Sequence, residues 1–372
     1  MNYRDVRDFL PFHIDGRKDE QRRISYIKNS KKKVVFYGCQ YCVGDIFYKF
    51  LKKNNVNIDY FCDAKKYFSE KNIINKGEFK YDVFEDIVRN IDNFIIVTGY
   101  PKHYIDESIL FDKLYEIYSF NIPLFDEEKN INKFYLENID SLNYLYNNLN
   151  DCTSKIIFKE CVSWYITRTH MPFTYADISK GLYFLDEFMD WNKKQIVVDA
   201  GAYTGDTFNE FMTKKPENAD FKYYALEPDA ENYKILQHNT SKHENVYVLN
   251  CGVYDKRGIV CFDDGNGLGS TITDSAEGNG ISKINVDTID NICKNDNVTF
   301  IKMDIEGSEL RALKGATEVI KRDKPVLAIC VYHKYEDLIT IPEFIHSIMP
   351  SYKFYLRHHD APFWGFMELF CV

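Results

Sequence analysis

Three acidic side chains each follow a short apolar run that is typical of a buried β-strand. Asp199, Glu227 and Asp304 stand at the ends of these runs. The carboxyl ends of parallel strands meet at one edge of an open α/β sheet, and ligands bind at that edge. Carboxylates there can accept hydrogen bonds from the hydroxyl and amino groups of a ligand. We therefore expect these acids to lie near a ligand site.

A glycine turn follows the first of these strands. Residues 197–207 contain the strand end, then Gly201 and Gly205, and then the start of a helix. Glycines let the backbone approach a ligand closely, and a helix N-terminus offers unpaired N–H groups. Asp199 would repel a pyrophosphate, so the turn suits a ligand with amino, sulfonium or hydroxyl groups. Glu227 is placed to accept both ribose hydroxyls of a nucleoside, and an exposed acid in a turn is the alternative.

The segment after the third strand is rich in charge. Strand alternation puts Lys302 and Asp304 on the same side, where Lys302 either pairs with Asp304 or only flanks the strand. Glu306 and Glu309 follow in the turn and in the first helical turn. Acids at that position stabilise a helix N-terminus, which accounts for Glu309 without any chemical role. The same explanation does not cover Asp304, which ends the strand itself.

Several ordered motifs continue this pattern to the end of the chain. They are VDAGAYTGD at 198–206, Glu227-Pro228, IKMDIEGSE at 301–309, LKGA at 313–316 and Tyr332-His333-Lys334. With these motifs, residues 141–372 resemble the FkbM-type S-adenosylmethionine (SAM)-dependent methyltransferases. The resemblance implies a doubly wound sheet with SAM bound at the strand C-termini. It also implies the cofactor-binding residues Asp199, Gly201, Tyr203, Gly205, Glu227, Asp229 and Asp304.

A hydroxyl acceptor requires a base in such an enzyme. The methyl group of a sulfonium is already activated, so the protein aligns donor and acceptor and removes the acceptor proton. Asp304, Glu306 and His333 are the candidate catalytic residues; for His333, which follows an apolar strand, a structural role is the alternative. Together with Glu309 they could hold a divalent cation. No spacing in the sequence demands a metal, and we expect none.

The resemblance implies an SAM-dependent O-methyltransferase. The habit of the family indicates a hydroxyl of a sugar, glycan or related metabolite as the acceptor, and hence carbohydrate modification. Two alternatives stay open, which are a methyltransferase with a non-sugar acceptor and a non-catalytic binding protein with the same fold. The Asn/Asp-Pro-Pro-aromatic motif of amino-group methyltransferases of nucleic acids is absent from the sequence.

The N-terminal region shows a second alternation of strands and helices. Apolar runs at 33–38, 58–62, 94–97 and 122–125 predict strands, and a helix is expected near 108–118. This alternation favours a parallel sheet. We therefore expect a smaller Rossmann-like α/β domain before the methyltransferase domain.

The first turn of this N-terminal domain carries two competing signals. Gly38 and Gly44 bracket the turn and Asp63 ends the second strand, as in a Rossmann-like half-domain that lacks one fingerprint glycine. Cys39 and Cys42 form a C-x-x-C pair at the same strand–helix junction, which is where redox proteins carry reactive thiols. The proline expected before the third strand of a thioredoxin-like fold is missing, so we favour the Rossmann-like interpretation. Acceptor binding and oligomerisation are candidate roles for this domain.

Length and composition are those of a multidomain globular protein. The chain has 372 residues, of which 45% are hydrophobic and 28% charged. We expect an N-terminal Rossmann-like domain at 1–130, a helical connector or cap at 131–190 and the SAM-dependent methyltransferase domain at 191–372. The net charge of −9 disfavours nucleic acid as a partner. An excess of Asn, Lys and Ile is typical of an AT-rich genome, and we expect a bacterial source.

Two further expectations concern location and the loops around the site. No secretory signal and no apolar run of about 20 residues is present, so we expect a cytoplasmic protein without a membrane span. Homo-oligomerisation stays open. Tyr183 and Phe184 either close over the pocket or pack in the core. Glycine-rich segments at 263–270 and 276–280 are either lids over the acceptor site or hairpin turns.

Overall fold

The computed structural model describes twelve parts of the chain, and these form two compact units. The described parts are residues 5–10, 16–37, 48–49, 51–63, 81–83, 94–98, 117–119, 131–167, 181–263, 271–273, 281–359 and 367–372. Unit 1 comprises Met1–Phe9, Asn138–Cys161 and Phe173–Val372, and unit 2 comprises Leu10–Glu137 and Val162–Pro172. The domain boundaries at residues 130 and 190 stay predictions. Each unit is described by itself below.

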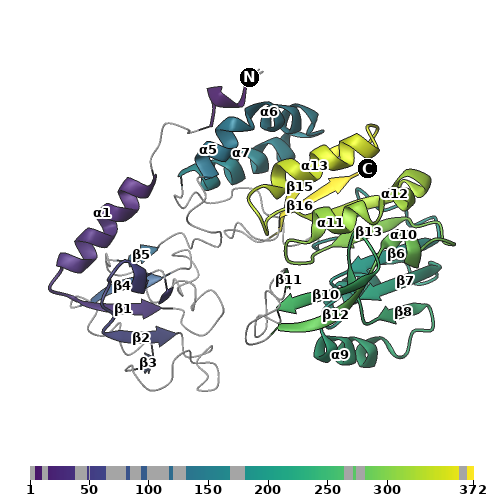
Figure 1. Ribbon diagram of the computed structural model, residues 1–372, viewed down its shortest axis with the longest axis horizontal. Helices are drawn as coiled ribbons and strands as arrows, with labels where there is room; N and C mark the ends of the chain where they lie inside the picture. Colours follow the sequence, from purple (N-terminus) through teal and green to yellow (C-terminus); the bar gives the residue numbers. More distant parts are fainter. Residues whose placement is uncertain are drawn as a thin grey trace. The chain divides into compact units, whose positions relative to one another are not determined.

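In the described part of unit 1, seven strands form a central sheet (Figure 1). The spatial order is β15-β16-β14-β13-β6-β7-β8, and β16 runs in the direction opposite to the other six described strands. The chain moves from β6 to β7 and β8 on one side and to β13 and β14 on the other, so the order reverses between β6 and β13. The strands are Gln195–Ala200 (β6), Phe221–Leu226 (β7), Val246–Leu249 (β8), Phe300–Met303 (β13), Val326–Cys330 (β14), Phe354–His358 (β15) and Met367–Cys371 (β16).

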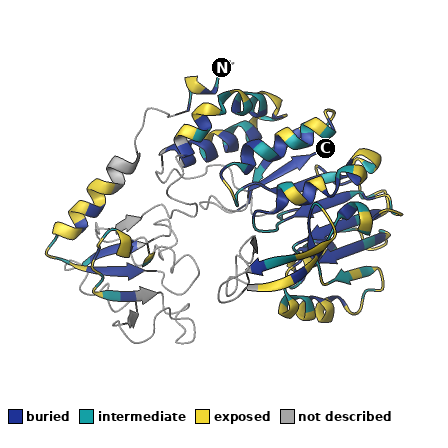
Figure 2. Ribbon diagram, viewed as in Figure 1, coloured by how far each residue is buried: buried dark blue, intermediate teal, exposed yellow. Residues whose placement is uncertain are grey.

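Helices cover this sheet, and its strands form the core. The central strands are buried along most of their length, as expected for parallel strands that are covered on both faces. Figure 2 shows the strands in dark blue and exposed residues on the outer sides of the helices. The expected mixed α/β fold with a largely parallel sheet is confirmed. The helices are Asp206–Lys214 (α8), Ala230–Thr240 (α9), Ile289–Ile292 (α10), Glu309–Lys314 (α11), Thr317–Asp323 (α12) and Asp337–Ile348 (α13).

Phe184 belongs to the core of unit 1. It is fully buried, and its ring centroid lies 5.1 Å from that of Phe211 and 4.9 Å from that of Phe300. Burial of aromatic rings is a large contribution to core stability. Of its two alternative roles, the structure therefore assigns Phe184 to core packing.

A small second sheet lies within unit 1, after β8. Its order is β11-β10-β12-β9, formed by Gly252–Val253 (β9), Gly258–Asp263 (β10), Thr271–Thr273 (β11) and Ile281–Asp287 (β12). Asp263 of β10 pairs with Thr271 of β11 in antiparallel register, as in a hairpin. The glycine-rich residues 264–270 and 274–280 themselves lie outside the described residues.

Helices also precede the seven-stranded sheet in the chain. The predicted helical stretch contains Ile131–Glu137 (α5), Ile139–Asn148 (α6) and Cys152–Thr167 (α7). Asn150, between α6 and α7, donates its N–H to the carbonyl of Phe354 over 2.9 Å. Arg357 of β15 pairs with Asp151 at 2.8 Å and with Glu187 at 2.9 Å. These contacts join the end of α6 and the start of α7 to the edge strand β15.

Unit 2 contains five described strands that are all parallel, in the order β3-β2-β1-β4-β5. Helix α1 (Gly16–Asn29) precedes them, and apolar residues of β1 and β4 form the centre of the core. The predicted strands near 33–38, 58–62 and 94–97 are confirmed. The strands are Lys33–Tyr37 (β1), Tyr60–Asp63 (β2), Tyr81–Val83 (β3), Phe94–Thr98 (β4) and Ile117–Ser119 (β5).

Two predictions for unit 2 need comment. The helix expected near 108–118 is wrong at its end, because residues 117–118 belong to β5, where a β-branched and an aromatic residue favour a strand. Residues 122–125, Gly38, Gly44 and the Cys39/Cys42 pair lie outside the described residues. The connections that would define a Rossmann-like domain also lie there, so that assignment stays a prediction.

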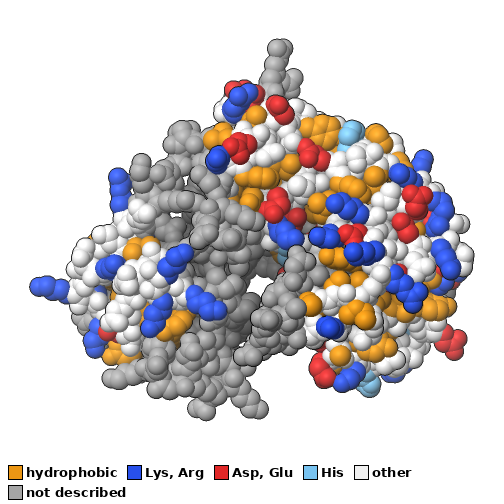
Figure 3. Space-filling view, in the orientation of Figure 1, with side chains coloured by type: hydrophobic (Ala, Val, Ile, Leu, Met, Phe, Trp, Pro, Cys, Tyr) orange, Lys and Arg blue, Asp and Glu red, His pale blue; other side chains and the backbone are white. Residues whose placement is uncertain are grey.

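The described parts of the chain show the following distribution of surface charge and length of helices. On the face of unit 1 that Figure 3 shows, basic and acidic side chains are interspersed rather than gathered by sign. None of the described helices is long and apolar enough to cross a bilayer.

Candidate active site

The C-terminal ends of β6, β7, β13 and β14 carry the predicted site residues. Asp199 lies in β6, Glu227 follows β7, Asp304 follows β13, and His333 follows β14 by a short turn. The reversal of strand order between β6 and β13 lies within this row. Ligands of open α/β sheets bind at such a switch point. The fold therefore gathers these residues at the edge where the sequence predicts a site.

Asp199 is completely buried, and its contacts are with side chains inside unit 1. Its Oδ1 lies 3.0 Å from Lys302 Nζ, and its Oδ2 accepts a 2.8 Å hydrogen bond from the Tyr223 hydroxyl. Lys302 also donates to the carbonyl of Gly201 over 2.6 Å. Burial opposes the charge on Lys302, but Asp199 and Asp304 hold its pKa above the ordinary value. Asp199 thus fixes the turn after β6 through Lys302, and its expected part in cofactor binding stays a prediction.

Gly201 and Gly205 have different tasks in the turn after β6. Gly201 has φ +77°, and a Cβ there would lie 1.9 Å from the backbone oxygen of Asp304. It therefore allows the turns after β6 and β13 to touch, and the expected close approach to a ligand stays a prediction. Gly205 has φ +98° and is the N-cap of α8, whose N-terminus has no side-chain cap among the described residues. Its first-turn N–H groups are therefore available to a ligand.

Glu227 is a buried carboxylate held by backbone groups. Its Oε2 accepts the N–H of Tyr203 and its Oε1 accepts the N–H of Asp229, both over 2.9 Å. Burial raises the pKa of Glu227 to about 7. Tyr203 has a left-handed backbone (φ +45°) and an exposed side chain. Asp229 uses Oδ1 to cap α9 by accepting the N–H groups of Glu231 and Asn232.

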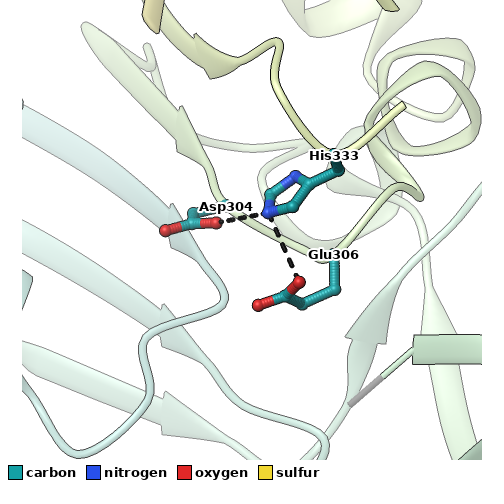
Figure 4. A group of neighbouring side chains, drawn as sticks. All are labelled: Asp304, Glu306 and His333. Atoms are coloured by element: carbon teal, nitrogen blue, oxygen red, sulfur yellow. Dashed lines mark ion pairs between the residues drawn. The ribbon is translucent and has the colours of Figure 1, made fainter. Parts of the chain in front are cut away.

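Asp304, Glu306 and His333 form a compact cluster (Figure 4). His333 Nε2 lies 3.3 Å from Asp304 Oδ1 and 3.4 Å from Glu306 Oε2. On the other side of the ring, Nδ1 lies 2.9 Å from Oε1 of the buried Glu309. That oxygen also accepts the N–H of Ile305. The structure therefore brings the three candidate catalytic residues together, and Glu309 orients the imidazole from behind.

Two tyrosines complete the surroundings of Asp304. Tyr183 donates its hydroxyl to Asp304 Oδ2 over 3.0 Å, and Tyr332 donates to Oδ1 over 3.4 Å. Burial favours the neutral form of Asp304, but His333 and Lys302 hold its pKa well below the usual range. Tyr183 is itself buried, so it is a partner of Asp304 more than a cover over the pocket.

His333 and Glu306 differ from each other in charge and access. Burial opposes the charge on His333, but Glu309 and Asp304 raise its pKa well above the ordinary value. Burial raises the pKa of Glu306, although 39% of its side chain is exposed. Glu306 also has φ +53°, a left-handed conformation that is unfavourable for its side chain and that clusters at functional sites. The turn thus holds Glu306 at the open side of the cluster.

Some members of this edge were missed by the sequence patterns. His359 and Glu368 are buried beside each other, with 3.2 Å between His359 Nε2 and Glu368 Oε2. The pKa of Glu368 lies well above its ordinary value. Burial is the largest cause, and the charge of Asp304 is the next. The signal in the sequence is an acid inside the apolar run 367–371. For the Tyr332 hydroxyl, the sequence offered no indication of a place in the site other than its position directly before His333.

Comparison with known structures defines the class of this fold. A crystal structure of the methyltransferase FkbM from Methylobacillus flagellatus KT matches with a TM-score of 0.68 and 21% identity, covering 98% of this chain and 94% of that one. Two weaker matches have TM-scores of 0.29, which is too low to support an argument. They are the precorrin-6y C5,15-methyltransferase of Geobacter metallireducens GS-15 (12% identity, 53% of this chain, 92% of that one) and a SAM dependent methyltransferase of Aquifex aeolicus (16%, 51% and 89%).

The family assignment rests on the sequence of unit 1. Residues 199–356 match the family described as the methyltransferase FkbM domain. No curated protein matches the chain. The matched segment runs from Asp199 to β15 and includes the cluster of Asp304, Glu306 and His333. This part of the chain is therefore an FkbM methyltransferase domain, as the resemblance of the motifs predicted.

Proposed function

We propose that this protein transfers the methyl group of SAM to a hydroxyl of a sugar, glycan or related metabolite. The observation that carries the proposal is the arrangement of the sheet edge in an FkbM methyltransferase domain. The site has two halves. The first half, which would hold the nucleoside and methionine parts of SAM, consists of Glu227 and the α8 N-terminus. The second half is the cluster of Asp304, Glu306 and His333. The contact between Gly201 and the backbone of Asp304 joins the two halves.

The residues of the first half fit SAM. Each oxygen of Glu227 accepts one backbone N–H and keeps a lone pair for a ribose hydroxyl. The N–H groups at the start of α8, after Gly205, suit the carboxylate of the methionine part. Glu227 and the Gly201–Gly205 turn would hold the cofactor, with Asp199 as a positioning residue behind them. When bound, SAM supplies an electrophilic methyl group.

The cluster of the second half fits activation of a hydroxyl. An alcohol attacks well only as its proton is withdrawn, and carboxylates near the oxygen provide that withdrawal. Asp304 and Glu306 both direct an oxygen to the space before His333 Nε2. Tyr183 holds Asp304 through a hydrogen bond, and Glu309 holds the ring of His333 through Nδ1. We assign the activation of the acceptor to Asp304, Glu306 and His333.

Calorimetry followed by a transfer assay tests the proposal. SAM should bind the full chain, Glu227→Ala should weaken binding, and the exposed Glu244→Ala should not. A panel of nucleotide sugars and glycans is then screened for formation of S-adenosylhomocysteine and a methylated product. Absence of SAM binding would overturn the proposal. Binding without turnover on the panel would instead favour a non-sugar acceptor or a non-catalytic binding protein.

A further inference from the structure

The donor atoms of the Asp304, Glu306 and His333 cluster have an unusual spacing. One oxygen from each acid and one ring nitrogen lie within 4.8 Å of one another. His333 Nε2 is 3.3 Å from Asp304 and 3.4 Å from Glu306. A charge-assisted N–H···O bond to a carboxylate is about 2.7–2.9 Å long, so both distances are too large for a good hydrogen bond. Donors about 2.2 Å from one cation, at right angles to each other, lie about 3.1 Å apart, which is close to the observed spacing.

The burial of His333 gives an independent observation. Only 8% of its side chain is exposed, and Nε2 lies 3.3 Å and 3.4 Å from its two carboxylate neighbours, without a partner at the shorter distance of a good hydrogen bond among the described residues. A buried polar group normally finds such a partner. Figure 4 shows Nε2 directed between the two carboxylates. The ring thus presents a nitrogen to a point that two acids also face.

Glu309 supplies what a metal-bound histidine needs behind it. Its Oε1 lies 2.9 Å from His333 Nδ1, and its side chain is fully buried. A histidine that binds a metal through one nitrogen usually directs the other to a carboxylate or carbonyl, which fixes the ring. Glu309 is therefore a positioning residue, and the orientation that it imposes leaves Nε2 facing the open side of the cluster.

We propose that Asp304 Oδ1, Glu306 Oε2 and His333 Nε2 bind one divalent cation of the Mn²⁺ class. Two carboxylates favour a hard cation, and the imidazole favours Mn²⁺ over Mg²⁺ or Ca²⁺. Three protein ligands leave coordination positions for water or for acceptor oxygens. Two neighbouring hydroxyls, as in a sugar ring, can occupy adjacent positions, and a bound cation lowers the pKa of a hydroxyl. The link to the acceptor rests on the proposed function; binding of the cation does not.

Binding of Mn²⁺ alone tests the site. The full chain is treated with EDTA, freed of chelator and titrated with Mn²⁺, and free Mn²⁺ is followed by electron paramagnetic resonance. We expect saturation at one ion per chain, loss of the site in Glu306→Gln, and unchanged binding in Glu244→Gln. Glu309→Gln should weaken binding by about 10- to 100-fold, as removal of an orienting partner does. Pulsed resonance should detect a coupled imidazole nitrogen that His333→Gln lacks.

The outcomes separate this site from the proposed function. No saturable Mn²⁺ binding, or equal binding by Glu306→Gln and Glu244→Gln, overturns the site. Full methyl transfer in EDTA together with absent binding would retain the function and reject the cation. Mn²⁺ binding without any SAM binding would retain the site and reject the function. Because Glu306 is partly exposed, Glu306→Gln is expected to fold, and circular dichroism checks this.

Discussion

Two acids at the ends of neighbouring strands, Asp199 and Asp304, have similar partners but differ in their exposure to solvent. Asp199 in β6 is held by a cationic side chain and a tyrosine, Lys302 and Tyr223. Asp304 after β13 is likewise held by His333 and a tyrosine, Tyr183. Asp199 is fully buried, whereas about a quarter of the Asp304 side chain is exposed, at 24%. The comparison indicates that the same residue types build a fully buried support at one strand and, at the next, a partly exposed acid to which the proposed function gives a catalytic role; exposure separates the two.

The pair Asp304→Asn and Asp199→Asn tests this separation most strongly. We expect Asp304→Asn to lower kcat by about 100- to 10,000-fold, because it removes a charge from the reacting cluster, while SAM affinity stays within a few-fold. Asp199→Asn should mainly lower the free energy of unfolding, because it leaves Lys302 buried without its partner. Steady-state kinetics, calorimetry and urea unfolding measure these effects. Equal kcat losses in both variants, with equal stability, would contradict the division of roles.

Lys302 offers the next largest effect. Lys302→Met removes the cation from Asp199 and is expected to cost about 3–5 kcal/mol of unfolding free energy. Lys222→Met, which breaks a more exposed pair with Asp296, should cost about 1 kcal/mol or less. Urea unfolding of both variants checks the difference. A Lys302→Met protein as stable as Lys222→Met would show that the buried pair does not support the edge.

The third strand-end acid, Glu227, gives a pH effect. Burial raises its pKa to about 7, so the charged carboxylate to which we assign the ribose hydroxyls in the proposed function is lost as pH falls below 7. SAM affinity should be constant well above pH 7 and fall by up to about tenfold per pH unit below it. Calorimetry from pH 5.5 to pH 8.5 measures this, in about half-unit steps. Glu227→Gln is the control, and the same slope in that variant would assign the titration to another group.

The two tyrosines provide the smallest effect and the finest comparison. Tyr183→Phe removes the hydrogen bond to Asp304 and should lower kcat by about fivefold, equivalent to about 1 kcal/mol. Tyr223→Phe removes the corresponding bond to Asp199 and should lower stability by a similar free energy, with little change in kcat. Kinetics and unfolding curves of both variants decide this. The opposite pattern would exchange the roles of the two acids.

Much of unit 1 could be predicted from local patterns. The apolar runs that precede Asp199, Glu227 and Asp304 are the strands β6, β7 and β13, because continuous burial leaves a clear signal in a parallel sheet. Strands β3 and β5 of unit 2 were missed. Each has three residues, which is too short for a periodic pattern to stand out from its surroundings.

The contacts of the site could be predicted less well. Alternation placed Lys302 on the side of Asp304, but its ion pair is with Asp199. That partner is set by the register of β13 against β6, in which Lys302 lies opposite Asp199. The direction of the Glu306 side chain depends on a left-handed backbone that its residue type does not favour. Register and unusual dihedral angles depend on distant packing, which no local pattern records.

The edge of unit 1 formed by β14, β16 and β15 has a consequence for the timing of folding. β16 lies between β14 and β15, and β15 in turn hydrogen-bonds to Asn150 and Ser154, more than 200 residues earlier in the chain. On the ribosome, β14 therefore has no antiparallel neighbour until residues 367–371 emerge. Contacts of such long sequence separation form late and slowly. The turn that carries His333 is thus secured only after residues 367–371 have emerged, and a nascent chain without β16 would carry an unpaired strand beside the cluster of Asp304, Glu306 and His333.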